Sequence, residues 1–406
     1  MTGEGRDREF DGNKVFEPGR IGPLDLKNRV IRTAAFEGMY PGGRPSSRLV
    51  EHHRQLAAGG IAMTTVSYCA VSSMGKTFGD QMVMSQDLLP DLRVVTKAVH
   101  DEGSACSIQL GHAGYFADKH AIGATPMGAS RLFNTYGMAL SRPMTESDIN
   151  SVVADFGLAA ELAAEAGFDA VEIHLGHGYL LSQFLSPYTN RRRDRWGGSL
   201  ENRLRLPLAV VDEVRKRVGG RLAVIPKINM TDGFSGGLEL DEALLVAATL
   251  EEHGVDALVL SGGFVSKTPF YMLRGKLPVK EMVATQKGWL RKTGLTLFGR
   301  ILVQEYEYRD LFFLDMARRA RHAVDLPLIY VGGVTSLSAM EQVMDEGFEF
   351  VALGRALIME PDLVNKMERG ELESVDCDHC NRCVAEMENN GIRCVTMDER
   401  RAAADV

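Results

Sequence analysis

The sequence lacks the features that mark membrane and secreted proteins. No apolar run in its 406 residues approaches the roughly 18 uninterrupted residues that a membrane helix needs. The opening residues, MTGEGRDREF, have no apolar centre of the kind found in a secretion signal. Six cysteines are too few for a disulfide scaffold in a chain of this length. We therefore expect a cytoplasmic protein with no membrane partner.

A surplus of positive charge and the common nucleotide-binding loops are also missing. The formal net charge is -8, whereas nucleic acids and anionic membranes bind to concentrated basic surfaces. No G-x-G-x-x-G and no G-x-x-x-x-G-K-[ST] motif occurs, which argues against a doubly wound dinucleotide-binding fold. The expected partner is therefore a small-molecule substrate and not a nucleic acid.

What the sequence does contain is an alternation of short apolar runs and helical stretches. This pattern is typical of parallel strands joined by crossover helices. The runs that predict strands lie at 29–34, 61–67, 104–110, 169–175, 222–229, 255–261, 327–331 and 348–353. Helices are predicted at 46–58, 88–102, 147–166, 199–218, 241–253, 304–323, 337–346 and 361–370. Eight such units favour an α/β fold with a single (β/α)₈ TIM barrel over an open sheet.

The barrel is expected to span residues 13–372, after a flexible N-terminal arm at 1–12. Two connections, 111–146 and 262–303, are too long to be plain turns. Both follow predicted strands, so we expect them over the barrel mouth, where such loops act as lids or substrate walls. The alternative for each is an oligomer contact or a mobile insertion. We also expect a homo-oligomer.

The end of the fourth predicted strand carries the densest set of reactive side chains. His174, His177 and Tyr179 follow one another in HLGHGYLLSQFLSP, at the end of a barrel where substrates bind. Two imidazoles can hold one oxygen together, and a phenol can give a proton without adding a full charge. These residues are therefore candidate catalytic groups; the alternative is that they are structural side chains with all hydrogen bonds satisfied.

A second cluster consists of four cysteines near the C-terminus. Cys377, Cys380, Cys383 and Cys394 are spaced C-x2-C-x2-C-x10-C. Three closely spaced thiolates and a fourth from farther along suit the corners of a [4Fe–4S] cube. A zinc site is the alternative, although four-cysteine zinc sites usually split into two C-x2-C pairs; absence of any metal is the other. We assign residues 373–406 to a cluster-binding segment, with His379 as a neighbour rather than a ligand.

The motif around the histidines resembles that of the old yellow enzyme family of flavin oxidoreductases. The resemblance is carried by H-x-x-H-G-Y-L-L-x-Q-F-L-S-P, by Asn190-Arg191-Arg192 and by the run from Trp196 to Arg203. It extends from the IGPLDLKNR segment at 21–29 to Gly354-Arg355.

This resemblance implies an FMN-containing barrel and a set of residue roles. His174 and His177 would hold the activating oxygen of a substrate, and Tyr179 would protonate the carbon beside it. Hydride would pass from the reduced flavin to an electron-poor carbon. Gln109 resembles the family's contact to the flavin ring, since an amide can both donate and accept.

The resemblance also implies a phosphate site at the last two strands. Gly332 and Gly333 follow one predicted strand, and Gly354 and Arg355 follow the other. Glycine lets backbone amides approach an anion, and arginine adds a charged fork, as in other barrel phosphate sites. The alternative is that these are tight turns and a surface arginine.

Two departures from the family pattern stand near the flavin. Lys227 occupies the place where the family commonly has an arginine, so a point charge would replace a planar fork. After the first strand the chain reads Thr33-Ala34-Ala35-Phe36, where family members often carry a proline and then threonine or cysteine. We expect this loss of a polar group to alter the potential and reactivity of the flavin, with Thr33, Ala34 and Ala35 beside it.

The leading hypothesis is an NAD(P)H-linked, FMN- and [4Fe–4S]-containing reductase of an activated alkene, such as an enone or enoyl thioester. The cysteine segment resembles that of trimethylamine dehydrogenase and 2,4-dienoyl-CoA reductase in its position. One alternative is therefore an amine dehydrogenase. Another is an electron-transfer subunit that works with a separate flavoprotein or ferredoxin, because a cluster moves single electrons. A structural cluster, with FMN reduced directly by NADH or NADPH, is the third.

Overall fold

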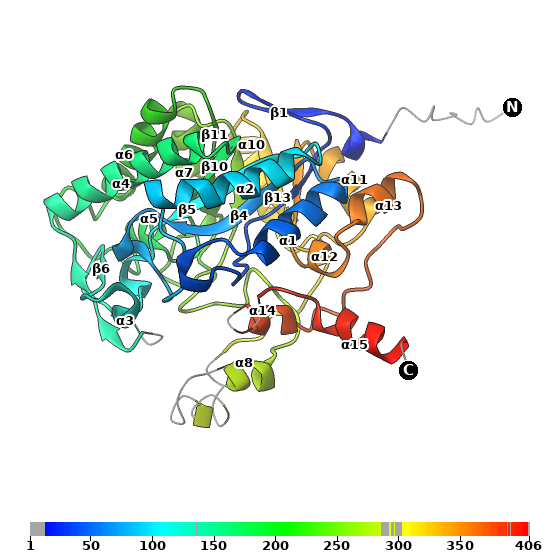
Figure 1. The fold of residues 1–406 in the computed structure, drawn as a ribbon. Helices are drawn as coiled ribbons and strands as arrows, with labels where there is room; N and C mark the ends of the chain where they lie inside the picture. The colour runs from blue at the N-terminus through cyan, green and yellow to red at the C-terminus, as the bar shows by residue number, and fades with distance from the viewer. Residues whose placement is uncertain are drawn as a thin grey trace, which may run out of the picture.

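The computed structural model describes residues 13–134, 137–285, 292–293, 296, 303–387, 389 and 391–404. The expected arm at 1–12 lies outside these residues. Eight parallel strands close into a barrel with helices around it (Figure 1), which confirms the predicted fold. In chain order the strands are β3 (Val30–Arg32), β4 (Met63–Ala70), β5 (Ala105–Gly111), β10 (Ala170–Leu175), β11 (Ala223–Asn229), β12 (Leu258–Ser261), β13 (Leu328–Val331) and β14 (Phe350–Leu353).

The helices follow the strands in the alternation that the sequence predicts. They include α1 (Ser47–Ala58), α2 (Leu89–His100), α4 (Glu146–Glu165), α6 (Leu200–Val218), α7 (Leu240–Glu252), α10 (Leu314–Ala323), α11 (Leu337–Asp345), α12 (Arg355–Met359) and α13 (Leu363–Glu368). Local chemistry sets their ends. On α4, for example, Thr145 and Asp148 form a reciprocal capping box that satisfies the first free backbone N–H groups.

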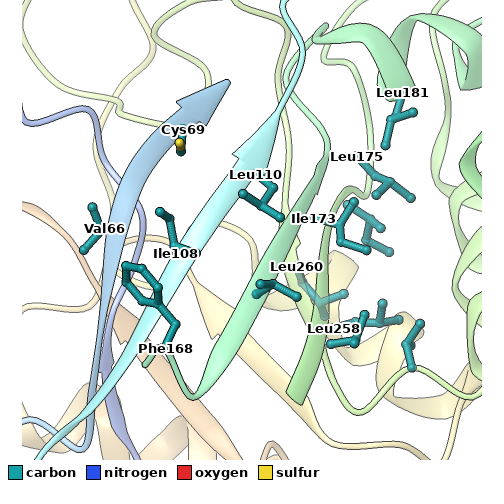
Figure 2. Packing of buried hydrophobic residues seen from close by; sticks show 14 of the residues in the cluster. Val66, Cys69, Ile108, Leu110, Phe168, Ile173, Leu175, Leu181, Leu258 and Leu260 are labelled. Carbon is teal, nitrogen blue, oxygen red and sulfur yellow. The ribbon is translucent and has the colours of Figure 1, made fainter. Parts of the chain in front are cut away.

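The strands divide their side chains between two apolar layers. Successive residues of a strand point to opposite faces. On β12, Leu258 and Leu260 lie in the layer between barrel and helices (Figure 2), whereas Val259 lies in the layer inside the barrel. The inner layer is closed at the bottom by Ile21 and Leu26, from the hairpin of β1 (Gly19–Ile21) and β2 (Leu24–Leu26).

Toward the carboxyl ends of the strands, the inward positions become polar. The residues concerned are Ser67 on β4, Gln109 on β5, Glu172 and His174 on β10, and Lys227 on β11, all of them buried. Polar side chains buried at this end of a barrel are costly unless they pair. The sequence therefore places its hydrogen-bonding groups where a barrel binds its ligand.

One predicted helix is too long by ten residues. The sequence predicts a helix over 304–323, but α10 begins only at Leu314. The preceding residues instead run along the loop after β12, where Gly275 N donates to the Tyr306 carbonyl. Leu311 then takes a left-handed φ of 50°, which no α-helix tolerates in its interior. A tertiary contact thus overrides the local helical pattern.

The two long connections behave differently. In the first, the described residues include α3 (Lys119–Ile122) and pack against α5 (Leu180–Leu185) and the turn after it; Arg192, for instance, donates to the Ala129 and Met144 carbonyls. No described residue of 111–146 lines the main cavity, so the expected role as a cavity wall is wrong there. The second connection, which contains α8 (Val279–Thr285), does line that cavity.

The cysteine-bearing segment closes onto the barrel mouth. Its helix α14 (Arg382–Glu386) contacts α8, and α15 (Val395–Ala404) follows α14 along the chain (Figure 1). Glycine makes this contact possible: a Cβ at Gly38 would overlap the Met387 carbonyl oxygen, and one at Gly275 would overlap that of His379. No described helix has the length and apolarity needed to span a bilayer.

The outer apolar layer gives a first test. Phe156 on α4 is fully buried, whereas Leu158 on the same helix is 47% exposed. Replacing Phe156 by alanine removes a buried ring and leaves a void, so we expect Phe156→Ala to lower the free energy of unfolding by about 3–5 kcal/mol. Leu158→Ala is the matched control and should change it by less than about 0.5 kcal/mol. Denaturant unfolding of both variants measures the difference; equal effects would mean that α4 is packed differently.

Candidate active site

The main cavity, of about 430 Å³, opens at the carboxyl ends of the barrel strands. Every residue that the sequence analysis assigns to catalysis or flavin binding lines it: Thr33, Ala34, Ala35, Gln109, His174, His177, Tyr179, Lys227, Gly332, Gly333, Gly354 and Arg355. The structure thus brings together residues from most of the barrel strands. Its wall also holds aromatic side chains, among them Phe36 and Phe78.

His174, His177 and Tyr179 form a compact group at one side of the cavity. The ring centroids of His174 lie 4.7 Å from Tyr179 and 5.0 Å from His177. His177 has a left-handed φ of 59°. Its Nε2 lies 2.7 Å from Ser261 Oγ, and Asn229 Oδ1 accepts its backbone N–H. This strained turn is fixed from β11 and β12, which keeps the two imidazoles side by side.

Burial fixes the charge of these groups. It lowers the pKa of His177 to about 3, and that of His174 well below its usual range, with nearby positive charge adding to the effect. Both rings are therefore neutral at pH 7. Gly176 N donates to His174 Nδ1 at 3.3 Å, so the neutral ring carries its proton on Nε2 and can donate from there. Burial raises the pKa of Tyr179 to about 12, which keeps the phenol protonated.

A buried polar chain crosses the barrel beneath these residues. Lys227 Nζ lies 2.8 Å from Glu172 Oε1 and donates to Thr33 Oγ1 at 3.1 Å. The same Glu172 oxygen accepts from Gln109 Nε2 at 2.5 Å, and Ser67 Oγ donates to Gln109 Oε1 at 3.2 Å. Each side chain in this chain of hydrogen bonds fixes the orientation of the one that follows. The Gln109 amide is thereby fixed in direction, with its nitrogen toward β10 and its oxygen toward β4.

The charge and shape of the cavity suit a flavin mononucleotide. Arg355 lines it, Lys227 lines it with its charge balanced by Glu172 at 2.8 Å, and none of the described lining residues is aspartate or glutamate, so the guanidinium favours an anionic ligand. At about 430 Å³ the cavity has the usual size of a cofactor site. Gly332, with φ 134°, and Gly333, with φ 73°, bring bare backbone to its edge. The residues present therefore fit the group.

Arg355 has a second set of partners. Its guanidinium donates to the Leu273 and Arg274 carbonyls and to Asn381 Oδ1. Asn381 in turn donates to the Arg274 carbonyl at 2.9 Å. Arg355 thus connects the loop after β12 to the cysteine segment, while it still lines the main cavity. The sequence analysis expected a phosphate ligand at this position, or else a surface arginine, and did not predict this link between two segments.

The four clustered cysteines line one small cavity of about 20 Å³, together with Arg355. All four thiols are free. No three histidine, cysteine, aspartate or glutamate side chains in the described part of the chain come together around a point that could hold a single metal ion. Cys383 lines the main cavity as well. The cysteine segment and the main cavity therefore share a wall.

Several residues of the site escaped the sequence analysis. Glu172 lies two positions before His174 on β10, so the period-two alternation of a strand could have placed it on the same inward face. Ser67, within β4, and Ser261, the last residue of β12, also line the cavity. Tyr308 could not have been found, because it meets His379 only through the fold: their rings stack with centroids 3.3 Å apart.

Together, the closed barrel and its cation-lined, glycine-edged mouth define a flavin oxidoreductase of the old yellow enzyme type. Comparison with known proteins agrees: residues 14–267 match the model of the NADH:flavin oxidoreductase / NADH oxidase family. The chain belongs to this family. It is an enzyme of the flavin oxidoreductase class.

The chain is 43% identical over 385 residues, 95% of both chains, to 4,4'-dithiodibutanoate disulfide reductase of Rhodococcus erythropolis. It is 30% identical over 370 residues to a metal reductase of Desulforamulus reducens, matching 91% of this chain and 51% of that one. The structure of 2-naphthoyl-CoA reductase superposes with a TM-score of 0.80 at 23% identity, covering 93% of this chain and 56% of that one. The chain thus spans 95% of the first of these proteins and about half of the other two.

The buried ion pair gives a second test. Glu172→Gln keeps the shape of the side chain but removes the charge that faces Lys227, which is 2% exposed. An unpaired buried ammonium is strongly unfavourable, so we expect the free energy of unfolding to fall by about 3–5 kcal/mol. Asp101→Asn breaks the exposed Lys97–Asp101 pair and should cost less than about 1 kcal/mol. Denaturant unfolding distinguishes the two; a small effect at Glu172 would show that water reaches Lys227.

Proposed function

We propose that this protein is an FMN-dependent reductase that transfers hydride to an activated C=C bond, of an enone or an enoyl thioester, with Tyr179 as the proton donor. The observation that carries the proposal is the contact of His174, His177 and Tyr179 within the cavity that also holds Lys227 and Gln109. Bound FMN, once reduced by NADH or NADPH, supplies the hydride.

The chain's own residues would supply the remaining chemistry. His174 Nε2, which carries the proton of a neutral ring, donates to the substrate oxygen, where negative charge grows during the reaction. His177, held against Ser261, stands beside it as the second imidazole. Tyr179 gives its proton to the carbon next to the carbonyl. Lys227 and the Gln109 amide would contact the flavin ring, and Gly332, Gly333, Gly354 and Arg355 the phosphate. Thr33, Ala34 and Ala35 would lie against the cofactor.

A second candidate is reductive cleavage of an organic disulfide. It is favoured by the 43% identity, over 95% of both chains, to a relative named for that activity. Here hydride would reach one sulfur, the S–S bond would break, and the other sulfur would leave as a thiolate. A thiol has a pKa of about 8.5, so a thiolate is a far weaker base than a carbanion, and this reaction places a much smaller demand on a proton donor than protonation of carbon does.

Tyr179→Phe separates the two candidates. Loss of the phenol should slow reduction of an enone by about 10²–10⁴-fold, yet change cleavage of a disulfide by less than about tenfold. Turnover of 2-cyclohexenone and of 4,4'-dithiodibutanoate, with NADH and NADPH in turn, measures both. Wild-type enzyme that cleaves the disulfide and ignores the enone would contradict the first proposal; equal turnover of the enone by both enzymes would contradict the role of Tyr179.

An amine dehydrogenase has less support from the site. A cationic substrate favours a carboxylate or an open aromatic cage. The described lining has aromatic side chains, but it also carries Lys227 and Arg355 and no acidic side chain, so its charge does not favour a cation. Reduction of the oxidised flavin by trimethylamine would nevertheless count for this function and against alkene reduction.

For the C-terminal segment we propose a [4Fe–4S] cluster held by Cys377, Cys380, Cys383 and Cys394. The proposal is supported by their spacing and by the small cavity that all four line. A [4Fe–4S] cluster binds one cysteine thiolate at each of its four iron atoms, whereas a single metal ion needs all of its ligands around one point. If the cluster is redox-active, a ferredoxin or a separate flavoprotein is the partner that single-electron transfer requires. If it is structural, it fastens the segment to the barrel mouth.

Iron analysis tests the cluster directly. Protein purified without oxygen should contain about four iron and four sulfide per chain. Cys383→Ala should lose most of both, because one corner ligand is missing. Cys106→Ala, at a buried cysteine of β5, is the matched control and should keep them. One zinc per chain without sulfide would replace the proposal by a zinc site.

A further inference from the structure

The loop that carries the cysteines contacts the barrel mouth through one buried amide. Asn381, between Cys380 and Cys383, is 1% exposed and has a left-handed φ of 58°. Asparagine adopts this backbone conformation more readily than most residues do. Neither the cysteine spacing nor the flavin motifs give it a role. A buried amide in a loop whose proposed metal ligands are all thiolates therefore calls for an explanation.

The hydrogen bonds of this amide fix its direction. Its Nδ2 donates to the Arg274 carbonyl at 2.9 Å and to the Lys276 carbonyl at 3.0 Å. Two carbonyl acceptors on one side decide which end of the amide is nitrogen. The oxygen, Asn381 Oδ1, accepts from Arg355 Nη1 at 2.7 Å. Because Lys276 N also donates to the His379 carbonyl at 3.0 Å, the cysteine loop and the loop after β12 hold the amide from both sides.

These contacts use only part of the Arg355 guanidinium. Nη1 donates to Asn381 Oδ1 and to the Arg274 carbonyl, and Nη2 donates to the Leu273 carbonyl. A guanidinium has five N–H groups, so the Nε hydrogen and one Nη2 hydrogen have no acceptor in the described part of the chain. Nε is not enclosed by protein, and Arg355 lines the main cavity. Two neighbouring N–H groups of this kind suit two oxygens of one phosphate.

We propose that Asn381 is a positioning residue for Arg355, whose guanidinium it holds with the unused N–H groups toward the phosphate of bound FMN. The inference rests on the proposed flavin site. Asn381 accepts one Nη1 hydrogen and orients the Arg274 carbonyl that accepts the other. Without this amide, the long arginine side chain would have to be ordered when the flavin binds, at a cost in rotamer entropy. The affinity for FMN thereby depends on a residue of the cysteine loop.

The test compares FMN with riboflavin, which has the same ring system and no phosphate. Enzyme purified without oxygen is depleted of flavin and titrated with each flavin, whose fluorescence reports binding. We expect Asn381→Gly to weaken binding of FMN by about 10–100-fold, the effect of one hydrogen bond to a charged group, and that of riboflavin by less than about twofold. Glycine adopts the left-handed backbone without strain, so the loop conformation should persist.

A double-mutant cycle with Arg355→Ala separates positioning from a general structural role. Arg355→Ala should weaken FMN at least as much as Asn381→Gly does and leave riboflavin unchanged. In the Arg355→Ala background, Asn381→Gly should have no further effect, because no guanidinium remains to be oriented. Asn381→Ala repeats the measurement in case glycine disturbs the loop.

Glu281→Gln is the matched control. It breaks another contact between the cysteine segment and the loop after β12, where Arg382 Nε lies 3.3 Å from Glu281 Oε1. This pair does not include Arg355, so both flavin affinities should stay at the wild-type level. Phosphate-specific weakening in Glu281→Gln as large as that in Asn381→Gly would overturn the inference, since any loosening of the segment would then suffice.

The remaining outcomes distinguish the inference from the proposed function. Wild-type FMN affinity in both Asn381 variants, or equal weakening of FMN and riboflavin in both, would overturn the inference alone. So would additive effects of Asn381→Gly and Arg355→Ala. If Arg355→Ala weakens FMN no more than riboflavin, or if the wild-type enzyme does not bind FMN, the proposed flavin site fails and this inference with it.

Discussion

The buried ion pair between Lys227 and Glu172 is the interaction on which the polar end of the barrel depends. It places an ammonium and a carboxylate 2.8 Å apart on neighbouring parallel strands, at positions almost closed to water. Two such charges are tolerated only when their remaining hydrogen bonds are also made. Thr33 completes the shell of the ammonium, and Gln109 that of the carboxylate.

From this pair the order spreads outward. Gln109 hydrogen-bonds both Glu172 and Ser67, so that side chains from four strands form one hydrogen-bonded frame. His174, two residues after Glu172 on the same face of β10, rises from that frame into the cavity. The rings that would act on a substrate are thus attached directly to hydrogen-bonded strand ends. Their positions relative to the barrel can change only by rotation about their own side-chain bonds. A lysine at this position serves the frame well, because its three hydrogens can satisfy oxygens in several directions.

Much of the architecture was accessible from the sequence. Eight alternations of apolar run and helix predict the barrel, and the location of polar residues at strand ends predicts the cavity that collects them. What the sequence could not supply are contacts between distant segments. The helix predicted over 304–323 loses its first part to the loop after β12, and Tyr308 stacks on His379 only because the fold brings their two segments together. The cysteine spacing predicted a shared site, but not that Cys383 would also face the main cavity.

The glycines under the cysteine segment bear on how such enzymes can be recombined. Gly38 and Gly275 lie in two different barrel loops, and each leaves room for one carbonyl of the C-terminal segment. A barrel from a relative with larger residues at both positions could not pack against this C-terminal segment, even if its own core were well formed. Conversely, the C-terminal segment fused to another barrel would lack the space that these two glycines leave for its carbonyl groups. The two parts of the chain therefore have to be inherited, or engineered, as a matched set.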